Sequence, residues 1–302
     1  MRSIPLIVAA SFMLPAAAAA QELTGTLRKI KETGTITLGA RETSVPFSYL
    51  DDKQQLVGYA IDICLKVVDA VKKELDLPAL RVSMVPATSS TRIPLMVNGT
   101  IDLECGPTTN NVDRQKQVGF TNTYFLTTGK FVSKTASRIS SVDDLKGKTV
   151  VSTSGSTNIR QLLDVNIQRK LGLNVLTAKD VAEAFLLVET DRAVAFVMDD
   201  VLLASLVASA KDPGAYTIST DTLSMPEPYT LMLRREDAPF KAVVDRATAE
   251  LYRSADGAAL YSRWFTQPIP PRNLNMNLPM APILSRAFQS PSDNADPKHY
   301  SN

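Results

Sequence analysis

The amino-acid sequence predicts an α/β fold, and three observations support this prediction. Segments with strand-like alternation and segments with helical periodicity follow one another along most of the chain. Polar or charged loops follow the predicted strands, which is where open α/β sheets carry their functional residues. The chain has 302 residues, of which 44% are hydrophobic and 21% are charged. This composition excludes a disordered or fibrous protein, and the length allows two domains.

The first half of the chain contains predicted strand–helix units. Apolar residues recur at helical spacing over residues 59–74 and predict a helix with one buried face. This face comprises Ile61, Cys64, Leu65, Val68, Val71 and Leu75. A second, shorter helix over residues 92–98 ends at Gly99. The predicted strands of this half are residues 35–39, 81–85 and 101–105.

The same alternation continues in the second half of the chain. The predicted strands are residues 149–152, 174–176, 193–198 and 229–233. The predicted helices are residues 158–171, 181–190, 201–210 and 238–253. Such alternation builds sheets with helices on both faces. The tail over residues 268–302 is rich in proline, asparagine and serine, and we expect it to run over the surface.

Charge and residue content exclude several classes of function. The chain has 33 lysine and arginine residues against 31 aspartate and glutamate residues, a net charge of +2. This near balance gives no overall attraction to nucleic acid or an anionic membrane. A single histidine, His299 near the C-terminus, and two cysteines do not favour a zinc site or a histidine-dependent catalytic set. We therefore expect no metal, no cofactor and no nucleic-acid partner.

The N-terminus has the features of a secretory signal peptide. Arg2 is followed by an apolar stretch over residues 4–14 and by alanines up to Ala20. The stretch is shorter than the roughly 20 residues that a membrane span needs. We expect a signal peptide over residues 1–20, with cleavage between Ala20 and Gln21, and an exported protein.

Export makes a disulfide bond possible between the two cysteines, Cys64 and Cys105. Both lie in apolar contexts, so two buried free thiols are the alternative. Sequence does not give the distance between their Cα atoms, and both possibilities stay open at this point.

Several loops after predicted strands carry polar groups that could bind an anion. These loops are residues 41–47, 86–92, 106–114, 153–157 and 199–200. Arg41, Arg92 and Arg114 lie in them, and the planar guanidinium group suits a carboxylate with two hydrogen bonds. The serine- and threonine-rich turn 153–157 leads into a predicted helix, whose N-terminus attracts anions. A plain helix cap is the alternative for this turn, and the two roles are compatible.

Long motifs in and around these loops resemble those of one protein family. The motifs are residues 41–49, 57–62, 88–95, 98–106, 108–115, 144–148, 192–196, 198–200 and 268–277. On these motifs the chain resembles the glutamate/aspartate-binding branch of the periplasmic solute-binding proteins of ABC importers, family 3. The resemblance spans nearly the whole chain after the predicted signal peptide.

The resemblance implies the type II periplasmic-binding fold, in which two α/β lobes are joined by two hinge strands and hold the ligand in the cleft. Lobe 1 would comprise residues 21–127 and 226–302, and lobe 2 residues 128–225. The implied protein is a periplasmic monomer, not an enzyme. It closes on L-glutamate or L-aspartate by hinge motion and delivers the ligand to a membrane permease.

The resemblance also implies roles for individual residues. Arg114 would bind the α-carboxylate of the ligand together with the turn that contains Thr153 and Ser156. Arg41 and Arg92 would bind the distal carboxylate, with Ser89 as a hydroxyl donor. The implied acceptors of the ligand ammonium group are Asp199, Thr109 and the backbone carbonyl of Pro107.

Two positions depart from the pattern of this branch. Pro107 replaces a serine, but its carbonyl remains, so we expect ammonium binding to survive. Val181 replaces a histidine near the distal carboxylate, which would remove one charge-assisted hydrogen bond of about 1.5–3 kcal/mol. Either Arg41 and Arg92 are enough to bind the distal carboxylate of glutamate, or the preferred ligand is not glutamate itself. We expect Phe47 to form part of the pocket wall because it lies in the loop that begins with Arg41.

Two other classes of function are compatible with this resemblance. An exported dehydratase acting on a cyclic carboxylate would need a carboxylic acid catalyst, for which Glu42 and Asp199 are candidates. A sensor domain would report the presence of the ligand to a membrane kinase, and it would have to do so by docking on that kinase. Turnover of such a substrate would distinguish the enzyme from a binding protein.

Overall fold

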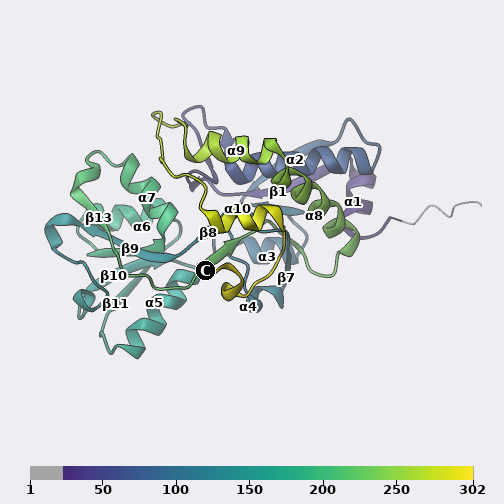
Figure 1. Ribbon diagram of the computed structural model, residues 1–302. Helices are drawn as coiled ribbons and strands as arrows, with labels where there is room; N and C mark the ends of the chain where they lie inside the picture. The colour runs from purple at the N-terminus through teal and green to yellow at the C-terminus, as the bar shows by residue number, and fades with distance from the viewer. Residues whose placement is uncertain (1–22, 302) are drawn as a thin grey trace, which may run out of the picture.

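The computed structural model of the chain describes residues 23–301. The predicted signal peptide, residues 1–20, lies outside the described residues. Figure 1 shows two α/β lobes side by side, each built on one five-stranded sheet. Across residues 23–301, no helix combines the length and the apolar character needed to span a membrane.

The sheet of the first lobe has the strand order β5-β1-β6-β15-β7. Its strands are β1 (Thr35–Ala40), β5 (Arg81–Pro86), β6 (Leu103–Cys105), β7 (Val118–Phe120) and β15 (Met232–Arg234). Strands β5 and β6 both run parallel to β1, whereas β15 pairs antiparallel with β6 and β7. The sheet therefore combines an early part of the chain with a strand that lies more than a hundred residues later.

Helices cover both faces of this first sheet, as alternation predicts. They are α1 (Gly25–Thr33), α2 (Tyr59–Glu74), α3 (Arg92–Val97), α4 (Val112–Gln115), α8 (Ala238–Arg253), α9 (Ala255–Phe265) and α10 (Pro282–Gln289). A small separate sheet has the order β2-β3-β4 and consists of β2 (Thr43–Ser44), β3 (Ser48–Leu50) and β4 (Leu56–Val57).

The sheet of the second lobe has the order β11-β10-β12-β9-β13. Its strands are β9 (Gly129–Lys134), β10 (Thr149–Thr153), β11 (Asn174–Ala178), β12 (Ala195–Asp199) and β13 (Tyr216–Ile218). Its helices are α5 (Thr157–Gln168), α6 (Val181–Glu189) and α7 (Asp200–Ser209). Strands β11 and β12 run parallel to β10, and β9 is antiparallel to β12. Short 3-10 helices are η1 (Thr135–Ser137), η2 (Asp143–Leu145), η3 (Pro213–Ala215) and η4 (Pro297–Tyr300).

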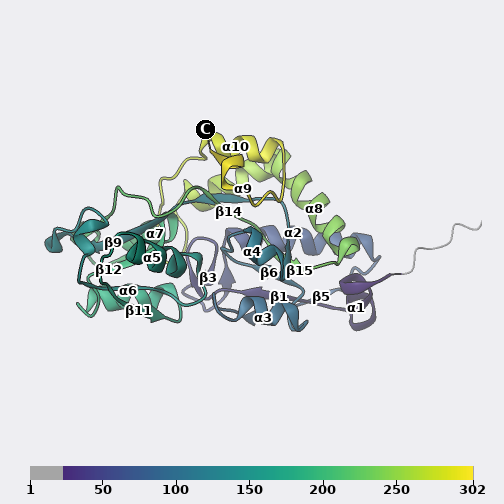
Figure 2. The same ribbon diagram turned by 90° about the horizontal axis from the view of Figure 1, so that it is seen from below.

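Two further strands connect the two lobes. Strand β8 (Phe125–Thr127) leads directly into β9, and β14 (Glu227–Tyr229) leads back toward β15. The two strands pair with each other in antiparallel register, with Tyr229 opposite Phe125. Figure 2 shows the chain crossing between the lobes in this region. The structure thus joins the lobes by a pair of hydrogen-bonded segments.

Helix α2 has the predicted bounds and buries most of the predicted face. Leu65 is the exception, because its side chain is 39% exposed while Ile63 and Val67 are buried instead. Cys64 on α2 forms a disulfide bond with Cys105 at the end of β6, with the two Cα atoms 6.1 Å apart. The alternative of two free thiols is therefore wrong.

The structure departs from the predicted elements in several places, and helices α1 and α9 are among the elements that were not predicted. The predicted strand over residues 229–233 is two strands, β14 and β15, because the chain changes pairing partners between the hinge and the first sheet. The tail contains a helix, α10, that was not predicted. Leu284 and Phe288 of α10 are buried, and the Phe288 ring stacks on Tyr252 of α8 with centroids 4.7 Å apart.

Candidate functional site

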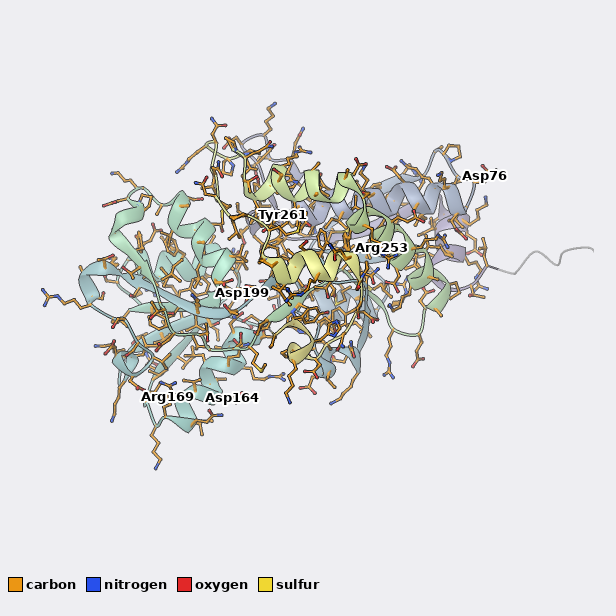
Figure 3. The ribbon with its side chains drawn as sticks, viewed as in Figure 1. Asp76, Asp164, Arg169, Asp199, Arg253 and Tyr261 are labelled. Carbon is orange, nitrogen blue, oxygen red and sulfur yellow. A yellow bond between two sulfur atoms is a disulfide. The ribbon has the colours of Figure 1, made fainter. Side chains whose placement is uncertain are left out.

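A pocket between the lobes is lined by residues from the carboxyl ends of strands in both sheets. Ten of the eleven predicted ligand-binding residues line it: Arg41, Ser89, Arg92, Pro107, Thr109, Arg114, Thr153, Ser156, Val181 and Asp199. These residues follow or end β1, β5, β6, β10, β11 and β12, as expected of a ligand site in an open α/β sheet. In Figure 3, Asp199 lies where the two lobes meet. The structure thus brings together residues that lie far apart in the sequence.

Phe47 does not line the pocket, so its predicted place in the wall is wrong. Its side chain is 0% exposed. It packs among rings of the hinge strands and α9, with centroids 5.0 Å from Phe125, 5.4 Å from Tyr229 and 5.7 Å from Phe265. This aromatic cluster offers the ring full removal from water, which the polar pocket does not.

Arg41 is fixed by a buried ion pair. Its Nε donates to Oε1 of Glu104 over 3.1 Å, and its Nη1 donates to Oγ of Ser89 over 2.9 Å. Glu104 has no exposed surface, and its other oxygen accepts from the Thr108 hydroxyl over 2.8 Å. Nη2 of Arg41 is buried and has no hydrogen-bond partner among the described residues. The ion pair therefore orients the guanidinium group and leaves one donor available for a ligand.

Arg92 is a buried cation that has no ion pair among residues 23–301. Its side chain is 2% exposed, and its Nη1 donates to the backbone carbonyl of Ser89 over 2.7 Å. Burial, followed by repulsion from Arg114 and Arg41, holds the pKa of Arg92 well below its usual value. Because Arg41 and Arg92 both contact Ser89, they form one cationic part of the pocket.

Arg114 spans the cleft from the first lobe. Its Nη1 donates to the carbonyl of Thr109 over 2.8 Å, and its Nη2 donates to the carbonyl of Gly155 in the second lobe over 3.2 Å. Burial is the main cause that lowers the pKa of Arg114 to about 10, while the carboxylates of Glu227 and Asp199 oppose this shift. Arg114 therefore keeps its charge at neutral pH and lies beside the turn that opens α5.

The turn between β10 and α5 carries a helix cap and an unpaired hydroxyl. Ser156 is the N-cap of α5, since its Oγ accepts from the Ile159 amide over 3.2 Å. Its hydroxyl also donates to the Thr153 carbonyl over 2.7 Å. Oγ1 of Thr153 is buried without a hydrogen-bond partner among the described residues. The cap is thus present, and the start of α5 faces the pocket.

Asp199 is the buried acid on the opposite wall. Its Oδ1 accepts from Nδ2 of Asn158 over 2.9 Å, and its Oδ2 accepts from the Tyr229 hydroxyl. Burial, helped by the nearby charge of Glu227, raises the pKa of Asp199 to about 7. Its side chain makes no capping hydrogen bond to α7. Asp199 is therefore held in place by side chains and remains directed at the pocket.

Asp200, the neighbouring acid, has a structural role. Its Oδ1 accepts from the Val201 amide over 2.7 Å and from the Thr127 hydroxyl over 2.6 Å. Its Oδ2 accepts from the Thr128 hydroxyl over 2.9 Å. Asp200 thus ties the start of α7 to the end of the hinge strand β8.

Ten further residues line the pocket, and six of them lie in the candidate loops without having been assigned to ligand binding. Further lining residues are Glu42, Thr43, Ser44, Ala87, Thr88, Thr157, Asn158, Asp180, Met198 and Leu202. Glu104, which pairs with Arg41, had one signal: it is an acidic residue between two apolar residues of a predicted strand. Asn158, which holds Asp199, gave no signal, because its partner is set by the packing of α5 on β12.

The charges of the pocket define the kind of ligand it can accept. Arg41 has a carboxylate partner, whereas Arg92 and Arg114 have none within ion-pair distance in the described part of the chain. A buried charge without a partner is costly, so anionic groups of a ligand would complete the site. Asp199 adds an acceptor for a cationic group. No cluster of three or more histidine, cysteine, aspartate or glutamate residues suited to a metal occurs in residues 23–301.

A two-lobed α/β fold with a polar pocket between its lobes defines a hinged binding protein. The chain matches the family model of bacterial extracellular solute-binding proteins, family 3, over residues 36–267, and it belongs to this family. The family membership confirms the resemblance and places the chain among extracytoplasmic binding proteins.

Known proteins similar to this chain include curated relatives and solved structures. It is 51% identical over 290 residues to the L-glutamate/L-aspartate-binding protein of Pseudomonas aeruginosa, covering 96% of this chain and 95% of the relative. It is 44% identical over 270 residues to the glutamate/aspartate import solute-binding protein of Salmonella typhimurium, covering 89% of each. An ancestral arginine-binding protein bound to arginine superimposes with a TM-score of 0.69 at 27% identity, covering 77% of this chain and 98% of that one. These similarities confirm the predicted two-lobed fold.

Proposed function

We propose that this protein binds an acidic amino acid, L-glutamate or L-aspartate, between its lobes and supplies it to an ABC importer. The observation that carries the proposal is the cluster of three buried arginines, of which only Arg41 has an ion-pair partner among residues 23–301. An acidic amino acid provides two carboxylates and one ammonium group. The names of the relatives at 51% and 44% identity support the same ligands.

The proposed binding mode assigns one cationic part of the pocket to each carboxylate. The α-carboxylate binds Arg114 and the turn at Thr153 and Ser156, where the start of α5 adds its dipole. The distal carboxylate binds Arg41 and Arg92, with the Ser89 hydroxyl as a further donor.

The ammonium group of the ligand binds acceptors on the opposite side of the pocket. Asp199 supplies the carboxylate, and Thr109 and the carbonyl of Pro107 supply further oxygens. Charge-assisted hydrogen bonds of this kind are about twice as strong as neutral ones. Val181, the first residue of α6, adds an apolar part to the wall of the pocket.

The proposed lobe boundaries follow the crossing strands. Lobe 1 comprises residues 21–127 and 226–302, and lobe 2 comprises residues 128–225. The chain passes from one lobe to the other at the end of β8 and at the start of β14, and these two strands pair with each other. Hinge motion at this pair closes the lobes on the ligand. We also propose a cleaved signal peptide over residues 1–20, a periplasmic monomer and delivery to a membrane permease.

The alternative of an exported dehydratase has no support from the relatives, which are named as binding proteins. Glu42, one candidate for its acid, is exposed at the pocket rim. Asp199, the other candidate, accepts hydrogen bonds at both oxygens, from Asn158 and Tyr229, and the proposed binding mode uses it as a further acceptor for the ligand ammonium group.

A thermal-melt panel tests the proposed ligand. The mature chain is unfolded and refolded to remove bound ligand, and is then melted with each common amino acid. Ligand at about a thousand times its dissociation constant stabilises by roughly 4 kcal/mol, which corresponds to about 8 °C or more. We expect such a shift with glutamate or aspartate. A shift with a neutral or basic amino acid, and none with either acid, would show that the proposed ligand is wrong.

A further inference from the structure

At Gly155 the backbone of the second lobe lies close to the backbone of the first lobe. It lies in the turn before α5, in the second lobe, with φ at +75°. A Cβ atom built on Gly155 would lie 2.7 Å from the carbonyl oxygen of Ser89 and 2.7 Å from Cα of Ser90, in the first lobe. Both are backbone atoms, so no side-chain rotation can make room for it.

Two further contacts join the lobes beside this approach. The Gly155 carbonyl accepts a hydrogen bond from Nη2 of Arg114 over 3.2 Å. At the outer edge of the cleft, Arg160 of α5 forms an ion pair with Asp113 of α4 over 3.1 Å. The Gly155 turn and the loop at Ser89 therefore touch while both belong to the wall of the pocket.

We propose that Gly155 sets the closed position of the lobes, and that any residue with a Cβ at this place holds the lobes apart and weakens ligand binding. This inference rests on the proposed function, because it concerns closure of the same pocket. Closure is needed for Arg114 and the α5 turn to reach one ligand together. A protein whose closed state is less populated binds its ligand more weakly by the same factor.

Substitution of Gly155 also changes the backbone preference, and a control must separate the two effects. Gly147, in the same lobe, has φ at +71°, and a Cβ atom there would meet no atom within 4 Å. Gly147→Ala therefore carries the cost of a left-handed residue without a contact between lobes. Gly155→Asn complements Gly155→Ala, because asparagine tolerates the left-handed region better and still carries a Cβ.

The experiment compares Gly155→Ala, Gly155→Asn and Gly147→Ala with the wild type. Calorimetry gives the affinity for glutamate, and small-angle X-ray scattering gives the radius of gyration with and without it. We expect both Gly155 variants to bind at least about tenfold more weakly than Gly147→Ala. We also expect them to lose most of the ligand-induced compaction, while the ligand-free melting temperatures of the alanine variants stay similar.

Two outcomes would overturn the inference or its basis, and they are distinguishable. If the wild type responds to glutamate and the Gly155 variants bind and compact as Gly147→Ala does, Gly155 does not set closure and the proposed function stands. If the wild type responds only to another amino acid, the proposed ligand is wrong, and the same comparison made with that amino acid decides the role of Gly155.

Discussion

Arg92 is a cation that the fold buries at the bottom of the pocket without an ion-pair partner among the described residues. Its pKa is lowered by burial and by Arg114 and Arg41, so its charge is unfavourable in the ligand-free protein. A ligand carboxylate reverses this penalty by pairing with the guanidinium group. Arg92 therefore lowers the stability of the ligand-free protein while it favours binding of the ligand.

We predict that Arg92→Met makes the ligand-free protein more stable. Methionine fills a similar volume without a buried charge, and even a buried ion pair can be replaced by apolar residues with a gain of about 1–4 kcal/mol. Urea unfolding measures the free energy of unfolding of the variant, with Arg169→Met as the control on an exposed arginine. A loss of stability larger than that of the control would contradict the prediction.

Arg114→Ala is expected to abolish binding of every amino acid. The α-carboxylate is common to all of them, and removing one partner of a buried charge pair costs about 2–5 kcal/mol, or roughly 30- to 4,000-fold in affinity. Calorimetry with glutamate, aspartate and glutamine measures the loss, and Arg169→Ala serves as the control. Near wild-type affinity in Arg114→Ala would mean that another group binds the α-carboxylate.

The ionisation of Asp199 affects two quantities in opposite directions. As the pH rises, the affinity for the ligand increases, and the stability of the ligand-free protein decreases. Its folded pKa of about 7 lies above the ordinary value of 3.8. Its contribution to the stability of the ligand-free protein is therefore fully present below pH 3.8 and is lost as the pH rises through about 7. The ligand ammonium needs the charged carboxylate, so binding weakens as the pH falls below 7.

Between pH 8 and pH 5.5 we predict roughly a thirtyfold loss of glutamate affinity, since the affinity falls by up to tenfold for each pH unit below the pKa. Calorimetric titrations across this range measure it. Asp199→Asn should bind weakly and show little change with pH. Constant affinity of the wild type down to pH 5.5 would rule out a titrating Asp199 as the ammonium partner.

The residues that contact a ligand could be predicted better than the residues that support them. Arg41, Arg92 and Arg114 have a side-chain chemistry that indicates a carboxylate and lie in long motifs after strands. Phe47 lies in the same motif as Arg41, but proximity in sequence does not decide which way a side chain points in a tight loop. The contact between Asn158 and Asp199 depends on how α5 packs on the second sheet.

At the scale of elements, the disulfide bond joins α2 to β6 at the centre of the first lobe. Its loop spans 41 residues. Closing a loop of this length in the unfolded chain stabilises a protein by about 4 kcal/mol in the chain-entropy model. We predict that the double variant Cys64→Ala, Cys105→Ala loses about this much free energy of unfolding in urea. A loss below about 1 kcal/mol would mean that the bond contributes little to stability.

Helix α10 fastens the C-terminal tail to the first lobe through its buried side chains. Phe288 is 4% exposed and stacks on Tyr252 of α8. We predict that Phe288→Ala lowers the free energy of unfolding by about 3 kcal/mol or more, as for other buried phenylalanines. Ile167→Ala on α5 is the matched control, because Ile167 is 74% exposed. Equal effects of the two substitutions would show that the tail does not stabilise the lobe.

The two longest helices could be predicted, whereas α9 and several short strands could not. The helices over residues 59–74 and 238–253 have the predicted bounds because several turns repeat the same apolar spacing. Strands β2 to β4 have two or three residues each, too few to show an alternation. Residues of β14 and β15 were predicted as one strand, because the sequence does not indicate where the chain leaves one sheet and joins another.

At the scale of the molecule, local patterns predict α/β units but not how the units divide between lobes. The first sheet combines β1, β5 and β6 with β15 from far along the chain, and the motif resemblance alone indicated this arrangement. The pocket is complete only where the two lobes meet, since Arg92 and Arg114 come from one lobe and Asp199 from the other. We therefore expect ligand binding to be coupled to closure of the lobes.

The preference of the pocket for glutamate over glutamine tests the proposed binding mode most directly, because the two amino acids differ mainly in the charge of the distal group. Calorimetry on the wild type and on Arg92→Met gives four affinities. We expect the wild type to prefer glutamate by at least about a hundredfold and Arg92→Met to reduce this preference below about tenfold. Equal affinities in the wild type, or a preference that survives Arg92→Met, would contradict the assignment of the distal carboxylate to the buried arginines.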